Sequence, residues 1–170
     1  MFSVNRWVAV FTIGAAFTGT AYAGNARLAS TELFDRATDL VKGHQAMSAA
    51  EIASSLGSAS QASPHGTQIT FPGGTYMGVS VSQIRVATTE AGIPEFVEII
   101  TDPSDCIDAT ILQTRYTADG LYDIPSAPAN QVQRYLTHDA DGIRIAIGIS
   151  MDHTFCAKSF IAEIATKPSK

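Results

Sequence analysis

The sequence predicts an α+β fold, with an antiparallel sheet of about six strands, three helices and one disulfide bond. Three segments place apolar residues three and four positions apart, as one face of a helix requires. Six other runs are rich in β-branched and aromatic residues, as strands require. The disulfide is predicted from Cys106 and Cys156, the only cysteines among the 170 residues.

The first two helices are marked by their ends. Ser30 is expected to cap a helix that ends at Gly43. A second, short helix begins with a capping box, in which Ser48 and Glu51 satisfy each other's backbone N–H groups, and it closes at Gly57. Both helices precede every predicted strand.

The third helix is predicted to begin at Asp102. This residue would be the N-cap, with Pro103 at the first helical position and Asp105 beside the positive end of the helix dipole. Cys106 would then lie in the first turn. A bond from Cys106 to Cys156 would join this helix to the last strand.

Three strands are predicted between the second and third helices. Residues 67–71 and 75–86 flank Pro72-Gly73-Gly74, which indicates a hairpin turn. Apolar residues change parity within the second strand, which predicts a bulge near Ser82-Gln83. Residues 95–100 form the third strand, and their apolar content predicts burial on both faces.

Three more strands are predicted after the third helix, at residues 131–138, 143–151 and 154–165. The first turn is Asp139-Ala140-Asp141-Gly142, in which Gly142 suits a left-handed conformation. Four isoleucines share one face of the middle strand, and small or polar residues alternate with them. This pattern is typical of a sheet that packs against a layer on one side.

A helix followed by three strands thus occurs twice, over residues 49–100 and 103–165, behind the leading helix. Two arrangements fit this order. The chain could form two helix-plus-three-strand halves, or one six-stranded sheet with the three helices on a single face. In either arrangement we expect residues 24–170 to form a single α+β domain.

The N-terminus has the pattern of a secretory signal peptide over residues 1–23. Arg6 precedes an apolar run from Trp7 to Phe17, and Ala21-Tyr22-Ala23 provides a cleavage site before Gly24. The apolar run is too short to span a bilayer, which needs about 20 residues. We therefore expect a soluble mature protein without a membrane anchor, located in the periplasm or secreted.

Export also bears on the two cysteines. A pair of cysteines in an oxidising compartment is usually bonded. Closing a loop of about 50 residues would stabilise the fold by roughly 4 kcal/mol, because it restricts the unfolded chain. We expect the Cys106–Cys156 bond to be a structural requirement.

The charge distribution argues against nucleic acid and anionic membrane surfaces as partners. Without residues 1–23 the chain has 10 basic and 16 acidic residues, a net charge of −6. The basic residues are scattered singly, whereas nucleic-acid-binding proteins gather them into patches.

The sequence lacks the patterns of common catalytic and metal sites. His138, Asp139 and Asp141 form one candidate cluster, and Asp152 with His153 forms another. They lie at opposite ends of a predicted strand, on the order of 25 to 30 Å apart at about 3.3 Å per residue, so they cannot share one ion. Turn chemistry explains both.

Neither a Gly-x-Ser-x-Gly elbow nor a phosphate-binding loop is present. We expect no enzymatic activity, no cofactor and no metal.

A long loop is predicted over residues 117–130, which contain one glycine and two prolines. Its anchoring residues are Leu121, Tyr122 and Ile124. Long loops often carry function, and aromatic residues are favoured at interfaces. We interpret Leu121, Tyr122 and Ile124 as a candidate recognition surface.

Residues 47–57, with the sequence Met-Ser-Ala-Ala-Glu-Ile-Ala-Ser-Ser-Leu-Gly, resemble the second helix of two families. These are the outer-membrane assembly lipoproteins of the SmpA/BamE type and the β-lactamase-inhibitor-protein fold. The resemblance implies two helices before an antiparallel sheet, no catalytic residues, and a function in binding other proteins. The chain lacks the lipid-acceptor cysteine of the assembly lipoproteins.

The leading hypothesis is a periplasmic protein that binds another protein, as an inhibitor, immunity factor or envelope accessory. One alternative is a small-ligand-binding protein, which would need a deep apolar pocket. Another is a hydrolase, which would need His65 close to one of the two Asp/His clusters.

Overall fold

One antiparallel sheet of nine strands forms the centre of the structure. The structure is a computed structural model that describes residues 21–58, 62–123, 132, 134–149 and 155–165, with side chains from Thr31 onward. The predicted α+β class is confirmed, and the described residues form three helices. The strands outnumber the six expected, because β1, β5 and β6 have only three, two and four residues, too few to show an alternating pattern.

The helices and strands have the following bounds. The helices are α1 Ala21–Lys42, α2 Ala49–Ser55 and α3 Ala109–Tyr116. The strands are β1 Ser63–His65, β2 Gln68–Tyr76, β3 Val79–Thr88, β4 Pro94–Thr101, β5 Ile107–Asp108, β6 Gly120–Asp123, β7 Arg134–Ala140, β8 Ile143–Ile149 and β9 Cys156–Ile164.

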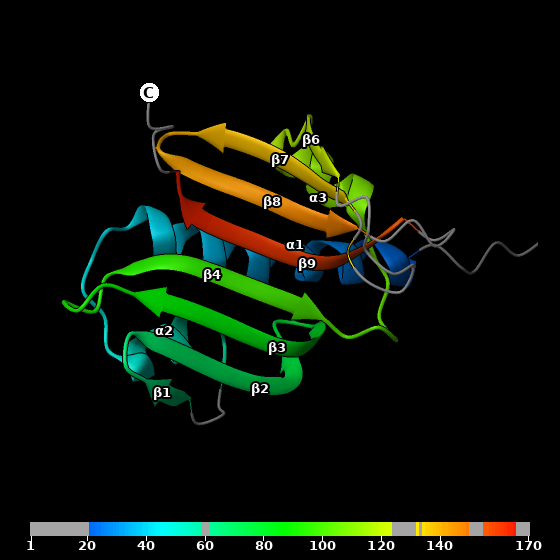
Figure 1. Ribbon diagram of the computed structural model, residues 1–170. Coiled ribbons are helices and arrows are strands. Elements are labelled where there is room, and N and C mark those ends of the chain that lie inside the picture. Colours follow the sequence, from blue (N-terminus) through cyan, green and yellow to red (C-terminus); the bar gives the residue numbers. More distant parts are fainter. Residues whose placement is uncertain (1–20, 59–61, 124–131, 133, 150–154, 166–170) are drawn as a thin grey trace, which may run out of the picture.

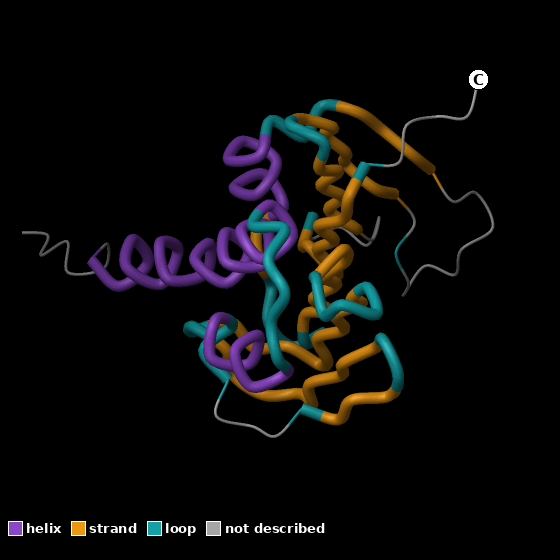
Figure 2. Tube along the Cα trace, turned by 90° about the vertical axis from the view of Figure 1, so that its left-hand side faces the viewer, coloured by secondary structure: helices purple, strands orange, loops and turns teal. Residues whose placement is uncertain are grey.

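The strand order combines the two arrangements that the sequence left open. It runs β1-β2-β3-β4-β9-β8-β7-β6, and β5 pairs with β9 outside this path. The two groups of strands meet where β4 pairs with β9, at the centre of the sheet (Figure 1). Figure 2 shows α1, α2 and α3 on the same side of the sheet. The chain therefore has two groups of strands within one sheet, and its helices cover one face.

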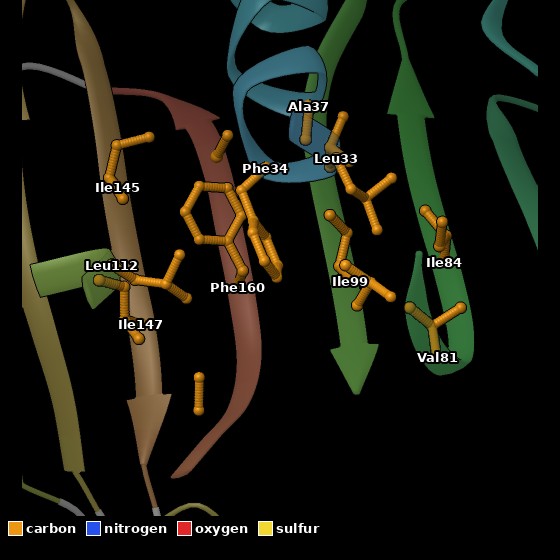
Figure 3. Packing of buried hydrophobic residues seen from close by; sticks show 14 of the residues in the cluster. Leu33, Phe34, Ala37, Val81, Ile84, Ile99, Leu112, Ile145, Ile147 and Phe160 are labelled. Carbon is orange, nitrogen blue, oxygen red and sulfur yellow. The ribbon is translucent and has the colours of Figure 1, made fainter. Parts of the chain in front are cut away.

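The core lies between the helices and the covered face of the sheet. Phe34 of α1 packs against Phe160 of β9 with ring centroids 5.0 Å apart, and Tyr116 of α3 contacts the same ring at 5.2 Å. Figure 3 shows Leu112 of α3 near Ile147 of β8, on the same face of the sheet. Burying large apolar side chains such as these stabilises the fold by about 1.5–3 kcal/mol each.

The expected helix ends are partly confirmed. α1 ends before Gly43 as predicted, but it begins at Ala21, upstream of Ser30, and its added residues include good helix formers. In α2 the capping box is confirmed. The Glu51 backbone N–H donates to Ser48 Oγ over 3.3 Å, and the Ser48 backbone N–H donates to Glu51 Oε2 over 2.7 Å.

The predicted hairpin at Pro72-Gly73-Gly74 is wrong. β2 continues through these residues, and the chain turns at Met77 and Gly78, whose φ angles are +47° and +80°. A glycine is required at position 73 by close packing rather than by a turn, since an added Cβ would lie 2.8 Å from the Ser82 carbonyl oxygen. The predicted bulge is confirmed, because the β3–β4 register shifts between Val81 and Gln83.

The predicted start of the third helix is also wrong. Asp102 to Asp105 form a turn, in which the Asp105 backbone N–H donates to the Asp102 carbonyl over 3.0 Å. The Asp102 carboxylate accepts from the Ser104 N–H over 2.8 Å, so its side chain satisfies the backbone locally without a helix. α3 begins at Ala109 and is capped by Asp108, which accepts from the Thr110 N–H over 2.9 Å.

The predicted disulfide is confirmed. Cys106 and Cys156 are bonded, with their Cα atoms 5.1 Å apart. Because α3 begins later than expected, the bond joins the segment before β5, rather than a helix, to the start of β9. The three predicted C-terminal strands are present as β7, β8 and β9, and Gly142 has the expected left-handed conformation with φ +77°.

Candidate functional site

The face of the sheet opposite the helices carries the candidate site, which we call the outer face. Cross-strand partners share a face, so the register defines rows of side chains across it. One row consists of Gln83, Ile100, Ser159, Gly148, Tyr135 and Tyr122. The next consists of Arg85, Glu98, Ile161, Ala146, Thr137 and Gly120. A third consists of Ala87, Phe96, Glu163, Arg144 and Asp139.

A groove of about 480 Å³ crosses these rows over β6 to β9, and we call it the outer groove. Ala146 and Ile161 form its floor, because the short Ala146 side chain leaves space between longer neighbours. Tyr122 and Tyr135 line one side. The groove is a depression in an open sheet face rather than an enclosed cavity.

Charged side chains line the other side of the outer groove. Arg144 Nε and Nη2 donate to the Asp139 carboxylate over 2.8 and 2.9 Å, and Arg144 Nη1 lies 3.6 Å from Glu163 Oε1. The hydrogen bond to Arg144 lowers the pKa of Asp139, and the same bond raises the pKa of Arg144. This side of the groove thus holds three fixed charges on three adjacent strands.

The two tyrosines differ in exposure. Tyr122 is 62% exposed, one of the most exposed large apolar or aromatic side chains in the described part of the molecule. Tyr135 is half-buried, and its burial raises the pKa of its hydroxyl. Both side chains end in a hydroxyl group that can donate and accept a hydrogen bond. They combine a polar tip with a large apolar surface, as interface tyrosines do.

The predicted recognition residues lie in different places. Tyr122 is opposite Tyr135 and lines the outer groove. Leu121 is opposite the core residue Leu136, so it belongs to the other face of the sheet, although it is 63% exposed. Ile124 lies outside the described residues. Part of the expected loop is therefore the edge strand β6.

Sequence reasoning did not single out Tyr135, Arg144, Ala146 or Ile161 as site residues. The alternating pattern of the predicted strand at residues 143–151 gave a signal for Arg144 and Ala146, since it placed them on the face opposite the four isoleucines. The pairing of β8 with β9, and of β6 with β7, supplies the missing information.

The structure separates the candidate catalytic residues. His138 lines a cavity on the helix face, whereas Asp139 lines the outer groove. His65 lies on β1, six strand positions from β7 and roughly 29 Å away at about 4.8 Å per strand. Asp152 and His153 lie outside the described residues. Across the described ranges, no three His, Cys, Asp or Glu side chains are grouped so as to hold a metal ion.

Comparison with known proteins leaves the chain without a family assignment. No protein-family model matches the sequence, and no curated protein matches it. The chain resembles the crystal structure of a DUF4309 family protein, YjgB, from Bacillus subtilis subsp. subtilis str. 168, with a TM-score of 0.49 and 8% sequence identity. The similarity covers 82% of this chain and 97% of that chain. In the part of the chain that the structure describes, no helix has the length and apolar character needed to cross a membrane.

Proposed function

We propose that the protein is exported and acts by binding another protein through the outer groove. The observation that carries the proposal is that all three described helices cover one face of the sheet, which leaves the groove with Tyr122 on the other face. A sheet face with an exposed aromatic residue beside an apolar floor is typical of an interaction surface.

The composition of the outer groove favours a protein partner. Its centre, Ala146 and Ile161, is apolar, while Arg144 and Glu163 line its edge. Protein interfaces have the same arrangement, with an apolar centre and a polar rim. We propose that the partner inserts an apolar side chain over Ala146 and places polar groups against the charged edge. The net charge of −5 disfavours nucleic acid as the partner.

The proposal includes binding and no catalytic step. A general acid or base acts best when its pKa lies near the working pH. The pKa of Asp139 is lowered and the pKa of Arg144 is raised, because their mutual hydrogen bonds favour the charged forms. Both pKa values thus move away from neutral pH. These groups are suited to fixed electrostatic recognition rather than to proton transfer.

Two features support export. Residues 1–23 have the charge, apolar run and small-residue site of a signal peptide. The Cys106–Cys156 bond is characteristic of proteins from oxidising compartments. Mass spectrometry of the protein from its native host should find Gly24 at the N-terminus. An intact Met1 on a membrane-bound form would refute this part of the proposal.

Site-specific photocrosslinking tests the proposed surface. A photoreactive residue at Thr137, in the outer groove, should capture a protein that the same residue at Arg36, on the helix side, does not capture. The captured protein would then be purified and its affinity measured. Tyr122→Ala should weaken binding by about tenfold or more, as removing a central aromatic residue commonly does.

Leu121→Ala is the matched control, because Leu121 is equally exposed and belongs to the other face of β6. It should leave the affinity unchanged. Equal effects of the two substitutions, or equal capture from both crosslinking positions, would contradict binding through the outer groove.

A further inference from the structure

A second concave site lies on the helix side of the sheet, and we call it the inner cavity. It has a volume of about 630 Å³ and lies between α1, the C-terminal end of α3 and the β7–β8 hairpin. This volume falls within the range of about 300 to 1,000 Å³ that small-molecule sites occupy. The outer groove opens on the opposite face of the sheet, so the two sites are separate.

One wall of the inner cavity is held rigid by a hydrogen-bonded network. The Asp35 carboxylate accepts from Arg115 Nε over 2.6 Å, from Arg115 Nη2 over 2.5 Å and from the Tyr116 hydroxyl over 2.7 Å. Arg115 Nη1 takes no part in these bonds. The guanidinium is therefore fixed in orientation and keeps one nitrogen for another acceptor.

The next residue on this wall, Thr117, has an unusual backbone conformation. It caps α3 with φ +52° and ψ +40°, a left-handed conformation that a β-branched residue rarely adopts. Such conformations cost about 1–3 kcal/mol and cluster at ligand sites. Here the conformation ends α3, and the Thr117 backbone N–H donates to the Gln113 carbonyl.

The floor of the inner cavity is apolar. Ile143 and Ile145 of β8 both line it, and they are 2% and 4% exposed. Nearly all of each side chain is already buried, so the floor offers a ligand only a small apolar contact area, whereas the walls are polar. The inner cavity is thus mainly polar.

Charges of both signs stand around this floor without partners. Asp39 and Lys42, near the end of α1, and Asp141, at the β7–β8 turn, line the cavity. None of the three forms a salt bridge with another described residue. Glu32 and Asp35, by contrast, are already paired with arginines.

We propose that the inner cavity binds the zwitterion of an amino acid or a short peptide. Asp39 and Asp141 would accept hydrogen bonds from its ammonium group, and Lys42 and Arg115 Nη1 would donate to its carboxylate. A singly charged ligand would meet a repulsive charge on this rim, whereas a zwitterion is matched at both ends. A metal ion is a poorer fit, because the described residues provide no group of three ligands.

NMR titration of the full-length protein tests this assignment with four probes. Leucine and leucyl-leucine are the zwitterions, and N-acetyl-leucyl-leucine and leucyl-leucinamide each lack one terminal charge. We expect a zwitterion to shift signals of residues around the inner cavity. Each blocked peptide should bind about tenfold more weakly, because it loses one charge-assisted contact. Whether leucine or leucyl-leucine binds more tightly identifies a free amino acid or a peptide terminus as the natural ligand.

Substitutions assign the two ends of the ligand. Asp141→Asn should weaken leucyl-leucine but strengthen N-acetyl-leucyl-leucine, whose lone carboxylate Asp141 repels. Lys42→Gln should weaken leucyl-leucine but strengthen leucyl-leucinamide, whose lone ammonium group Lys42 repels. Both positions are on the surface, and circular dichroism would confirm folding. Tyr122→Ala, in the outer groove, is the control that should change none of these affinities. Absence of shifts with both zwitterions at millimolar concentration, or equal binding of charged and blocked probes, would overturn the proposal.

Discussion

The Tyr116 hydroxyl donates a 2.7 Å hydrogen bond to Asp35, which lies 81 residues earlier in the chain. The same carboxylate accepts two hydrogen bonds from Arg115, so one side chain of α1 binds two consecutive residues of α3. The Tyr116 ring also packs on Phe160 of β9. This network joins two helices and the centre of the sheet.

Replacing Tyr116 by phenylalanine should lower the free energy of unfolding by about 1–2 kcal/mol. The substitution removes a hydrogen bond to a charged acceptor and keeps the aromatic ring against Phe160. Urea denaturation measures the change. Tyr122→Phe is the control, because the exposed Tyr122 has no such bond among the described residues, and it should have no measurable effect. Equal stability of Tyr116→Phe and the parent protein would show that the bond contributes nothing net.

The same tyrosine should make stability depend on alkaline pH. Burial, followed by the bond to Asp35, raises the pKa of Tyr116 well above its ordinary value of 10.0. Above about pH 10 the unfolded chain loses the phenol proton while the folded protein keeps it. The stabilisation is therefore fully present below about pH 10 and falls as the pH rises further. Between about pH 8 and pH 11, the parent should therefore lose more stability than Tyr116→Phe. Parallel losses in the two proteins would contradict this pKa shift.

Gly73 and Gly74 provide a matched pair within β2. A Cβ on Gly73 would lie 2.8 Å from the Ser82 carbonyl oxygen, whereas a Cβ on Gly74 would meet the nearest atom, Tyr76 Cε2, at 3.6 Å. Gly73→Ala should therefore destabilise the protein by about 1–3 kcal/mol, the usual cost of forcing extra atoms into packed structure. Gly74→Ala should be neutral or stabilising by up to about 1 kcal/mol, because it restricts the unfolded chain. Thermal denaturation of both variants would detect the difference, and similar melting temperatures would refute the close approach at Gly73.

Replacing both Cys106 and Cys156 by serine should destabilise the protein by about 2–4 kcal/mol, since their bond closes a loop with a sequence separation of 50. Thiol labelling of the unfolded, unreduced protein should find no reactive cysteine. The reduced parent protein is the matched control and should be about as stable as the double variant. Two reactive thiols in protein purified without reductant would contradict the bond.

Features encoded by neighbouring residues were predictable from the sequence. The capping box needs only Ser48 and Glu51, and the β7–β8 turn needs only a few residues around Gly142. The disulfide was also predictable, because the chain offers one possible pair. Elements that depend on contacts with residues distant in the sequence were not predictable. Asp102 can cap a helix, but its side chain bonds Ser104 instead, while Ile107 and Asp108 pair with β9.

The same distinction applies to the outer groove. Tyr122 was a candidate because it is an aromatic residue in a glycine- and proline-containing segment. Its neighbour Leu121 looked equivalent, and only the pairing of β6 with β7 places the two side chains on opposite faces. Arg144 and Glu163 are likewise 19 positions apart in the sequence and adjacent only through the β8–β9 register.

The pairing of β4 with β9 also affects when the protein can fold. β9 is the last described strand in the sequence, yet it lies at the centre of the sheet between β4 and β8. A growing chain that has not yet reached Cys156 has two unpaired strand edges and lacks Phe160, the contact of both Phe34 and Tyr116. We therefore expect stable folding to wait until nearly all of the described sequence has been made, because non-local strand pairs form slowly. Such a delay would keep the polypeptide unfolded during synthesis, which is the state that the proposed export through a translocation channel requires.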